Sequence, residues 1–522
     1  MKITSTFIIT ESLNIFKTWK RNGVTKKMCK NKLIKAIIYD KNVNPEKTNA
    51  TFERIKEILE NVLGEVAQKY INDLKEQIHI TDLRAPLNQK QADHIVTYIE
   101  NEKLEPESIN AIIEQLDYSE ISTSEAIDLH KKYKIPISHL EKDIIPIKGD
   151  GCWVMDTKGD WYLDMDSNYS ATNLGMTNKE IGQGLYNQAN TLISMKEDRV
   201  QIARTRFLKE ISSMMPKGLD YFYWQNSGGE AVDKALKIAK AYTDSKDVIA
   251  FKQGFHGRTH GAVAVTWKNE YKVPFHLDEE NWVHFAVFND IESVKNIVEK
   301  TGAKIIILEL VQGEEAGNRA ADPTFVKELW DYAHKNDIVI IDDEVQAGFG
   351  RTAVKKGDWF ACMSYDVIPD IMTIGKSFGG GYPVTAVVTA KKISDAMKPG
   401  YDGSTFGGNP MAMTAALIAT RQMRDQNITE NVVERSEEIR AGLEQLKKKF
   451  PVVNDISGRG LMIAFSVGTE ENVEKLVHAL HFQGVKTSLS TGKYIRFLPP
   501  TIITKEEVQE FLKRLEKALE SL

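Results

Sequence analysis

The chain has 522 residues, of which 42% are hydrophobic and 27% charged, with 34 glycines and 15 prolines. At a usual size of about 150 residues per domain this length predicts two to four domains, and the composition excludes a disordered or fibrous protein. The 68 Lys and Arg residues against 73 Asp and Glu residues give a net charge of −5. A small acidic excess argues against a protein with a wholly basic surface, so we expect no nucleic-acid partner.

Cysteine usage and the N-terminus bear on the compartment. Cys29, Cys152 and Cys362 stand far apart, with neither the pattern of a disulfide framework nor the paired spacing of a zinc site. The apolar stretch 6–10 is followed at once by Glu11, so it is too short for a signal peptide or a membrane-spanning helix. We therefore expect a soluble, cytoplasmic protein with no membrane partner.

The first 140 residues differ from the rest of the chain in charge pattern. Residues 1–50 contain 11 Lys and Arg against 3 Asp and Glu, whereas residues 51–140 contain 10 against 17. Apolar residues recur at helical spacing within 55–70 and within 109–116. We predict a helical N-terminal extension over residues 1–130, of unknown role. Its basic start is interpreted as a solvated end, with a nucleic-acid or membrane contact as the alternative.

From about Lys148 onward, short apolar runs alternate with amphipathic segments, which is typical of a parallel sheet with crossover helices. Four runs are apolar throughout and have the length of a buried strand: 248–251, 305–308, 338–341 and 371–374. Apolar residues at i, i+3, i+4 and i+7 predict a crossover helix between the second and third runs: Val326, Leu329, Trp330 and Ala333.

Ligands of such sheets bind beyond the carboxyl ends of the strands. Just after the four runs stand an aromatic ring, an imidazole, carboxylates, amides and a lysine: Phe255, His256, Glu309, Gln312, Glu314, Asp343, Glu344, Gln346 and Lys376. We expect these side chains at one rim of the sheet. His256 and His260 are spaced i, i+4 but have no third ligand nearby in the sequence, so we expect no bound metal.

A phosphate site is predicted ahead of these residues. Ser227 and Glu230 have the spacing of a capping box, and apolar residues at helical spacing follow them. Gly228 and Gly229 would then lie in the first turn of a helix, where backbone N–H groups and the helix dipole favour an anion.

Two nucleotide-binding motifs are excluded by the sequence itself. Gly375-Lys376-Ser377 matches the end of a P-loop, but the glycine required five positions earlier is Asp370. Gly458-Arg459-Gly460 begins a dinucleotide fingerprint, but the third glycine position holds Ile463.

All of these residues would be used by a cofactor of one kind. It would have one phosphate, a ring that is sandwiched between side chains, a ring nitrogen that needs an acid partner and an aldehyde that needs an amine. Pyridoxal 5′-phosphate has these groups. Residues 148–522 resemble a class III aminotransferase of fold type I and are similar to the ornithine δ-aminotransferases and acetylornithine aminotransferases. Eight motifs in one order carry the resemblance: 162–164 with 167–171, 226–231, 255–259, 343–352, 375–376, 379–383, 403–410 and 496–500.

The resemblance implies an α/β fold, that of the fold-type I pyridoxal-phosphate-dependent transferases, with a mainly parallel sheet in a large domain and a smaller α+β domain. The expected boundaries are 131–184 for the N-terminal segment of the small domain, 185–411 for the large cofactor-binding domain and 412–522 for the C-terminal part of the small domain. A homodimer with a shared active site is implied as well.

The resemblance also assigns cofactor roles residue by residue. Lys376 would hold the cofactor covalently and move the proton at the substrate carbon, and Asp343 would keep the ring nitrogen protonated. The other implied cofactor contacts are Phe255 on the ring face, Gln346 on the ring hydroxyl, Val345, and, for the phosphate, Ser227, Gly228, Gly229 and Thr405, the last across the dimer interface.

For the substrate, Arg496 is the implied carboxylate fork, and Glu314 matches the acid that pairs with it while an ω-amine is bound. Arg258, Ser404 and Tyr169 match positions that face the substrate side chain. The sequence departs from the family at Leu310, where proline is usual, at the extra acid Glu315, and over 136–146, where the family's substrate segment is not recognisable.

The expected activity is transfer of the ω-amino group of an ornithine-like donor (ornithine, acetylornithine or lysine) to 2-oxoglutarate by a ping-pong mechanism. A class III racemase or phospho-lyase is the alternative within the same chemistry. A non-catalytic binding protein that retains the fold is a third possibility, against which the intact Lys376, Asp343 and Gln346 count.

Overall fold

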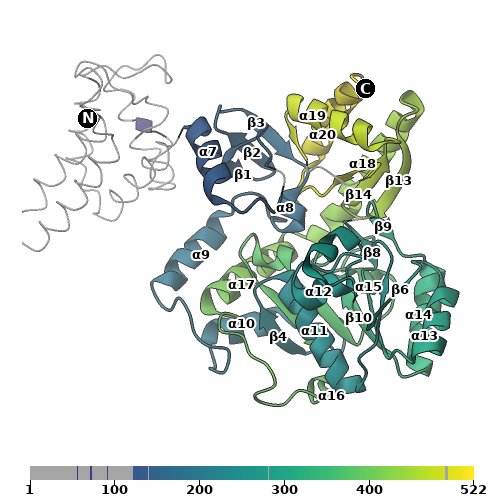
Figure 1. Ribbon diagram of the computed structural model, residues 1–522. Helices are drawn as coiled ribbons and strands as arrows, with labels where there is room; N and C mark the ends of the chain where they lie inside the picture. Colours follow the sequence, from purple (N-terminus) through teal and green to yellow (C-terminus); the bar gives the residue numbers. More distant parts are fainter. Residues whose placement is uncertain are drawn as a thin grey trace, which may run out of the picture. The chain divides into compact units, whose positions relative to one another are not determined.

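The computed structural model describes residues 122–138, 140–279, 281–314, 316–487 and 492–522, and the single residues 56, 71, 72 and 91. The chain divides into two compact units, residues 1–140 and 141–522 (Figure 1). In the first unit, helix α7 (Thr123–Tyr133) begins at Ser122, whose hydroxyl accepts a hydrogen bond from the N–H of Glu125. The helical periodicities of 55–70 and 109–116 lie almost entirely outside the described residues. The four domain ranges expected from the sequence stay predictions.

A seven-stranded sheet forms the centre of the second unit, with the strand order β4-β12-β11-β10-β7-β5-β6. Neighbouring strands from β11 through β6 are parallel, whereas β12 runs antiparallel to both of its neighbours. The strands are β4 (Tyr221–Gln225), β5 (Val248–Phe251), β6 (Val283–Ala286), β7 (Ile305–Leu308), β10 (Val339–Asp343), β11 (Ile371–Ile374) and β12 (Thr385–Thr389). The expectation of a mainly parallel sheet is therefore confirmed.

Three of the four apolar runs form strands with the bounds expected from the sequence. The fourth, expected over 338–341, is β10, which begins one residue later and continues through Asp342 and Asp343. The two carboxylates hide this continuation from an apolar pattern, although both side chains are buried. The crossover helix expected around 326–333 is α14 (Pro323–Lys335).

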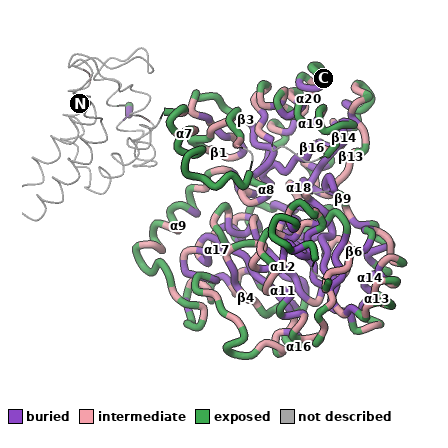
Figure 2. Tube along the Cα trace, in the orientation of Figure 1, coloured by how far each residue is buried: buried purple, intermediate pink, exposed green. Residues whose placement is uncertain are grey.

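Helices cover both faces of this sheet (Figure 1). Successive strand residues alternate between two apolar cores: Val248, Ala250, Ile305 and Ile307 pack in one with α11 (Gly228–Thr243), α12 (His260–Val265) and α16 (Lys391–Ser394). Their neighbours Ile249, Phe251, Ile306 and Leu308 pack in the other, with α10 (Ile202–Ile211), α13 (Ile291–Thr301), α14 and α17 (Pro410–Asp425). Figure 2 shows the strands buried between these layers. Because side chains of a strand alternate in direction, each strand end presents residues to both faces.

The rest of the second unit contains smaller sheets. Strands β1 (Pro146–Asp150), β2 (Trp153–Asp156) and β3 (Trp161–Asp164) form one sheet with β15 (Val485–Lys486), and β13 (Asn454–Arg459), β14 (Met462–Ser466) and β16 (Tyr494–Phe497) form another. The short pair β8 (Val311–Gln312) and β9 (Arg319–Ala320) is separate. Because β3 pairs in parallel with β15, segments more than 300 residues apart share one sheet.

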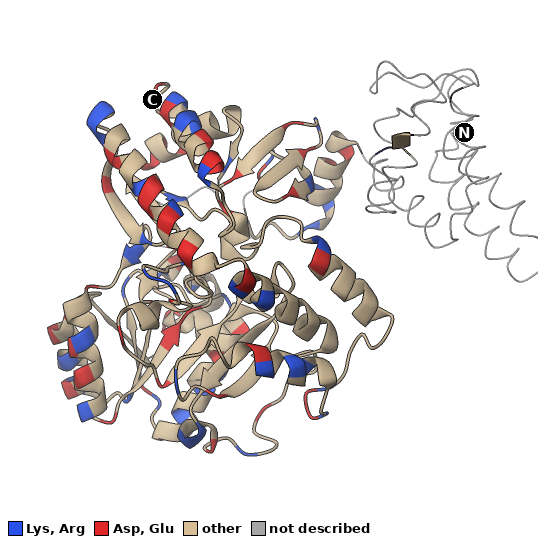
Figure 3. Ribbon diagram, turned by 180° about the vertical axis from the view of Figure 1, so that it is seen from behind, with Lys and Arg blue, Asp and Glu red and all other residues tan. Residues whose placement is uncertain are grey.

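The remaining helices are α8 (Ser167–Ser170), α9 (Lys179–Ala189), α15 (Ala361–Ser364), α18 (Ile428–Lys449), α19 (Glu470–Phe482) and α20 (Lys505–Leu519), with 3-10 turns at Asn269–Tyr271, Val273–Phe275 and Lys376–Gly379. Charged residues of both signs alternate on the outer helices (Figure 3), as where Lys449 of α18 pairs with Glu516 and Glu520 at the end of α20. In the part of the chain that is described, none of the helices combines the length and the apolar character needed to span a bilayer.

Candidate active site

A cavity of about 380 Å³ lies at the carboxyl ends of the central strands. Nine of the residues singled out from the sequence line it: Ser227, Gly228, Gly229, Phe255, Glu314, Asp343, Val345, Gln346 and Lys376. They come from the ends of β4, β5, β7, β10 and β11, which converge because parallel strands end at the same edge of a sheet. Seven of the nine side chains expected at one rim, His256 and Glu309 among them, line the cavity, whereas Gln312 and Glu344 do not.

Asp343, the last residue of β10, lines the cavity and is held in place by contacts from three other residues. Its Oδ2 atom lies 2.7 Å from Nδ1 of His256, and its Oδ1 atom accepts hydrogen bonds from Oγ1 of Thr373 at 2.8 Å and from the N–H of Val345 at 3.2 Å. Only 6% of Asp343 is exposed. These donors fix the orientation of the carboxylate, which can then pair with a protonated ring nitrogen.

Lys376 stands directly after β11 and Gly375, in the left-handed backbone region with φ of 47°. Burial lowers the pKa of its ammonium group, and the charges of Glu314, Asp343 and Glu309 oppose this shift without cancelling it. A lysine with a lowered pKa provides more neutral amine near neutral pH, which is the form that attacks an aldehyde. The sequence placed this lysine after a strand and, by resemblance, at the cofactor aldehyde, whereas the lowering of its pKa comes from its surroundings in the fold.

The N-terminus of α11 has the geometry of a phosphate site. The hydroxyl of Ser227 accepts from the N–H of Glu230, and the Glu230 carboxylate accepts from the N–H of Ser227, which confirms the capping box. Gly228 and Gly229 follow in the first turn and line the cavity. A Cβ atom at Gly229 would lie 2.9 Å from Oγ1 of Thr259, so the glycine allows a close backbone approach that a side chain would block.

Glu314 and Arg496 form an ion pair at the cavity wall. Nη1 of Arg496 donates to Oε2 of Glu314 and, at 2.9 Å, to the carbonyl oxygen of Gly313. The guanidinium side chain is 7% exposed and the carboxylate side chain 25% exposed. Of the two side chains, Glu314 lines the cavity and Arg496 does not. The carboxylate is therefore the more exposed member of the pair, and the guanidinium lies behind it.

The turn α8 brings the segment 167–171 to the cavity, which Asn168 and Ala171 line. Four successive residues without glycine have positive φ, from 43° at Ser167 to 76° at Ser170. Such backbone costs about 1–2 kcal/mol per residue, so the surroundings must hold it. Arg351, fully buried, does this: its guanidinium donates to Oγ of Ser170 at 3.0 Å, to Oγ of Ser167 at 3.1 Å and to Oδ1 of Asn173. Ser170 in turn donates to the carbonyl oxygen of Gln346 at 3.1 Å.

The other expected substrate and cofactor residues lie beside the cavity or away from it. The carbonyl oxygen of Tyr169 accepts from Nε2 of Gln346 at 3.4 Å. Arg258 stacks on Tyr271, with 3.6 Å between its guanidinium carbon and the ring centre. Ser404 and Thr405 do not line the cavity of this chain: Oγ of Ser404 accepts from the N–H of Gly407 at 3.0 Å, and Thr405 is exposed.

Three buried side chains belong to the site although the sequence assigned them no role in it. His256 was considered only as a metal ligand, yet it contacts Asp343; Thr373 was part of an apolar run. Glu309 accepts from the N–H of Phe255 at 2.8 Å and from that of Gly313 at 3.3 Å, and burial raises its pKa to about 7. Their position just before or after strand ends was the only signal in the sequence.

The residues of the cavity fit pyridoxal 5′-phosphate. Backbone amides at the α11 N-terminus suit the phosphate, the Asp343 carboxylate suits the ring nitrogen, and the Lys376 amine suits the aldehyde. Phe255 and Val345 line the cavity as apolar groups for the ring faces, and Gln346 offers an amide. The roles of the single residues stay predictions.

Comparison with known proteins gives the family. The model of the class III aminotransferases matches residues 137–519. The chain is 35% identical over 370 residues to the LysW-aminoadipate semialdehyde/glutamate semialdehyde transaminase of Sulfurisphaera tokodaii, covering 71% of this chain and 93% of that protein. It is also 35% identical over 385 residues to acetylornithine aminotransferase of Archaeoglobus fulgidus, covering 74% of this chain and 97% of that one.

Solved structures agree with this family. The ornithine aminotransferase of Toxoplasma gondii matches with a TM-score of 0.71 and 25% identity, covering 82% of this chain and 98% of that chain. Another structure of the Toxoplasma gondii enzyme, described as having partial occupancy of pyridoxal phosphate at its active site, matches with a TM-score of 0.73 and 26% identity, covering 78% of this chain and 97% of that chain. The chain belongs to the class III aminotransferases, enzymes of fold type I that use pyridoxal 5′-phosphate.

Proposed function

We propose that this aminotransferase moves the ω-amino group of an ornithine-like donor (ornithine, acetylornithine or lysine) to 2-oxoglutarate in two half-reactions. The observation that carries the proposal is the ion pair between Glu314 and Arg496 at the cavity wall. Curated relatives named as acetylornithine and aminoadipate semialdehyde transaminases, and solved structures named as ornithine aminotransferases, support this donor class.

In the chemical step, bound pyridoxal phosphate supplies an electron sink for the charge that develops at the substrate carbon. Asp343, with its oxygens directed by His256 and Thr373, holds a proton on the ring nitrogen through its negative charge. Nζ of Lys376, with its lowered pKa, would take the proton from the substrate carbon and later deliver it to the cofactor carbon that received the amino nitrogen.

The ion pair decides which end of a diamino acid reacts. An uncovered Arg496 would bind the α-carboxylate of the donor and place its α-amino group at the cofactor. While Glu314 covers the guanidinium, the donor binds with its ω-amino group at the cofactor instead. In the second half-reaction the carboxylates of 2-oxoglutarate repel Glu314, which leaves Arg496 to bind one of them as a fork.

The experiment is a donor panel. Purified protein is mixed with 2-oxoglutarate and either ornithine, acetylornithine, lysine, γ-aminobutyrate or a simple diamine, and glutamate is assayed. We expect glutamate from at least one of the first three donors and the slowest formation from the last two. A donor that is consumed or racemised without glutamate formation would instead indicate a lyase or racemase.

The role of Glu314 is tested by Glu314→Ala, with the exposed Glu444→Ala on α18 as the matched control. The rate of the first half-reaction is measured from the cofactor absorbance with an α-amino donor and with an ω-amino donor. We expect the ratio of the first rate to the second to rise about tenfold in Glu314→Ala. A tenfold change corresponds to roughly 1.4 kcal/mol, the size of one charged contact. An identical response of both donor classes would contradict the masking role.

We also propose that the active site is completed in a homodimer. Thr405, which by resemblance contacts the phosphate across the interface, is exposed and outside the cavity of its own chain. Tyr401 and Phe406 in the same loop are 57% and 58% exposed, which is unusual for large apolar side chains and suits a protein interface.

Complementation tests the shared site. Lys376→Ala and Thr405→Glu are each expected to be inactive, because one lacks the amine and the other places a carboxylate at the phosphate. In mixed dimers one of the two sites has both native residues, so unfolding and refolding a mixture should restore about a quarter of the native activity. No recovery in dimers shown to be mixed would place Thr405 and Lys376 in the same subunit's site.

A further inference from the structure

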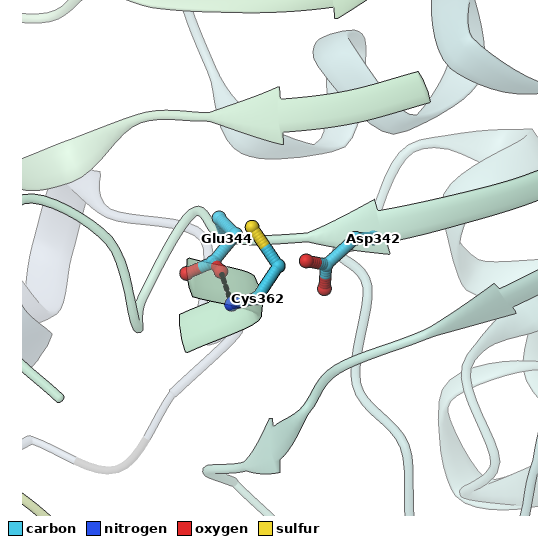
Figure 4. A group of neighbouring side chains, drawn as sticks. All are labelled: Asp342, Glu344 and Cys362. Atoms are coloured by element: carbon cyan, nitrogen blue, oxygen red, sulfur yellow. Dashed lines mark hydrogen bonds between the residues drawn. The ribbon is translucent and has the colours of Figure 1, made fainter. Parts of the chain in front are cut away.

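A second polar cluster lies beneath the active site, on the opposite face of the central sheet. Val339 and Ile341 of β10 pack with α11, and Ile340 packs in the other core, so Asp343 and Asp342 point to opposite faces. Asp342 points toward Glu344 and toward Cys362 at the start of α15 (Figure 4).

These three side chains are among the most buried polar groups of the described chain. Asp342 is 0% exposed, Glu344 1% and Cys362 0%. The carboxylate oxygens and the sulfur atom that could bind a ligand lie within 4.8 Å of one another. Cys362 is a free thiol, as is Cys152. Two carboxylates and one thiol therefore meet inside an apolar core, where solvent does not reach them.

Three of the four carboxylate oxygens in this cluster have no hydrogen-bond donor from outside the cluster among the described residues. These three are both oxygens of Asp342 and Oε2 of Glu344. The other oxygen of Glu344 accepts from the N–H of Cys362 at 3.0 Å, which fixes the carboxylate beside Cys362 (Figure 4). Buried carboxylates are normally paired or bound to metal, because a charge without a partner is costly in an apolar interior.

We propose that Asp342, Glu344 and Cys362 bind one divalent cation of the zinc type. Zinc accepts both thiolate and carboxylate ligands, whereas magnesium and calcium prefer six or more oxygen ligands, several of them usually water. Metal binding would give the buried carboxylates the partner that they otherwise lack.

The cation would have a structural role next to the chemistry. It would join β10, whose last residue is Asp343, to the start of α15, two elements 18 residues apart in the chain. The proposal does not depend on the substrate or on the proposed reaction, because none of the three ligands lines the active-site cavity.

The test is the metal content of untagged holoenzyme, measured by mass spectrometry. The native protein is compared with the cluster variants Asp342→Asn and Cys362→Ala. Cys152→Ala is the matched control, because Cys152 is also a buried free cysteine. We expect about one zinc per chain in the native protein and in the control, and less than about 0.1 in the two cluster variants. X-ray absorption should show one sulfur ligand at about 2.3 Å from the metal.

A second measurement covers variants that fail to fold. The native protein is refolded with and without zinc, and we expect the zinc-loaded form to melt at a higher temperature. Folded native protein that contains no metal after refolding with zinc would overturn the proposal. In that case the infrared spectrum of the native protein would be compared with that of Asp342→Asn. A band of a protonated carboxyl group that is present in the native protein and absent from the variant would show that the three groups share protons instead.

Discussion

His256 holds Asp343 in place, with 2.7 Å between Nδ1 of the imidazole and Oδ2 of the carboxylate. Burial alone lowers the pKa of His256, but the hydrogen bond to Asp343 and the charges of Asp343 and Glu309 outweigh it and raise the pKa. The histidine therefore orients the carboxylate of Asp343 toward the position that a ring nitrogen would take. His256 acts through Asp343 and is a positioning residue.

Replacing His256 tests this relationship. In His256→Gln we expect kcat to fall roughly 10- to 100-fold, because loss of a hydrogen bond to a charged group costs about 1.5–3 kcal/mol. The cofactor should remain bound, with its absorbance maximum shifted, since the ring nitrogen loses part of its charged partner. The exposed His334→Gln on α14 is the control. A variant with unchanged absorbance and normal kcat would show that His256 is only a packing residue.

Asp343 should be needed for rate and not for binding. Asp343→Asn keeps the shape of the side chain but removes the negative charge, so we expect cofactor retention and a loss of about a hundredfold or more in kcat. Steady-state rates and the cofactor content of the same preparation check this. Asp366→Asn, at an exposed position that also has positive φ, is a suitable control. Near-normal activity of Asp343→Asn would refute the role.

Arg351 should matter for both stability and substrate binding. Besides its contacts to α8, its guanidinium donates to the carbonyl oxygens of Pro499 at 2.5 Å and Leu461 at 3.3 Å. Burial lowers its pKa to about 9, with Asp164 and Asp166 opposing the shift. Arg351→Lys removes the planar guanidinium group with its several donors. We expect the free energy of unfolding to fall by about 2–4 kcal/mol, because several buried acceptors lose their donors.

Urea unfolding and KM for the amino donor together check the role of Arg351. KM should rise, because the left-handed turn at Ser167–Ser170 is no longer held next to Gln346. The exposed Arg199→Lys should change neither quantity. If stability falls while KM stays constant, the turn does not depend on this arginine.

The ion pairs of Asp402 predict a stability change at acid pH. Burial alone would raise the pKa of Asp402, but hydrogen bonds from Lys234 and Lys237 lower it to about 2. Because the folded pKa lies below the unfolded value of about 3.9, this stabilisation is complete above about pH 4 and is lost as the pH falls toward 2.

Asp402→Asn should therefore destabilise the protein by about 1–2 kcal/mol at pH 7, a value reduced for solvent screening, and the difference from the native protein should shrink as the pH approaches 2. Urea midpoints across this range measure it. The exposed pair of Lys327 and Asp331 provides the control, since Asp331→Asn should have little effect at any pH. A difference that is constant with pH would exclude the ion pairs as its cause.

The sequence predicted the strands that are apolar on both faces and failed where polar residues are buried. β5, β7 and β11 begin and end as expected because helices cover both faces of the sheet, so each residue in them is apolar or small enough to be buried. β10 extends to Asp343 although it ends in two acids: Asp343 is held by contacts from His256 and Thr373, and Asp342 is buried in the cluster with Glu344 and Cys362. A local pattern contains no information about such contacts.

For the site, the sequence alone determined which residues stand at the strand ends, the capping box at Ser227 and the family resemblance, because these depend on neighbours in the chain. The tertiary structure decided the partners. His256 meets Asp343 across 87 residues, Arg351 holds a turn 181 residues away, and Asp342 and Glu344 point away from the cavity toward Cys362. The alternation of side chains along β10 and the packing of distant segments against it fix these contacts, and neither is visible in the spacing of residues along the chain.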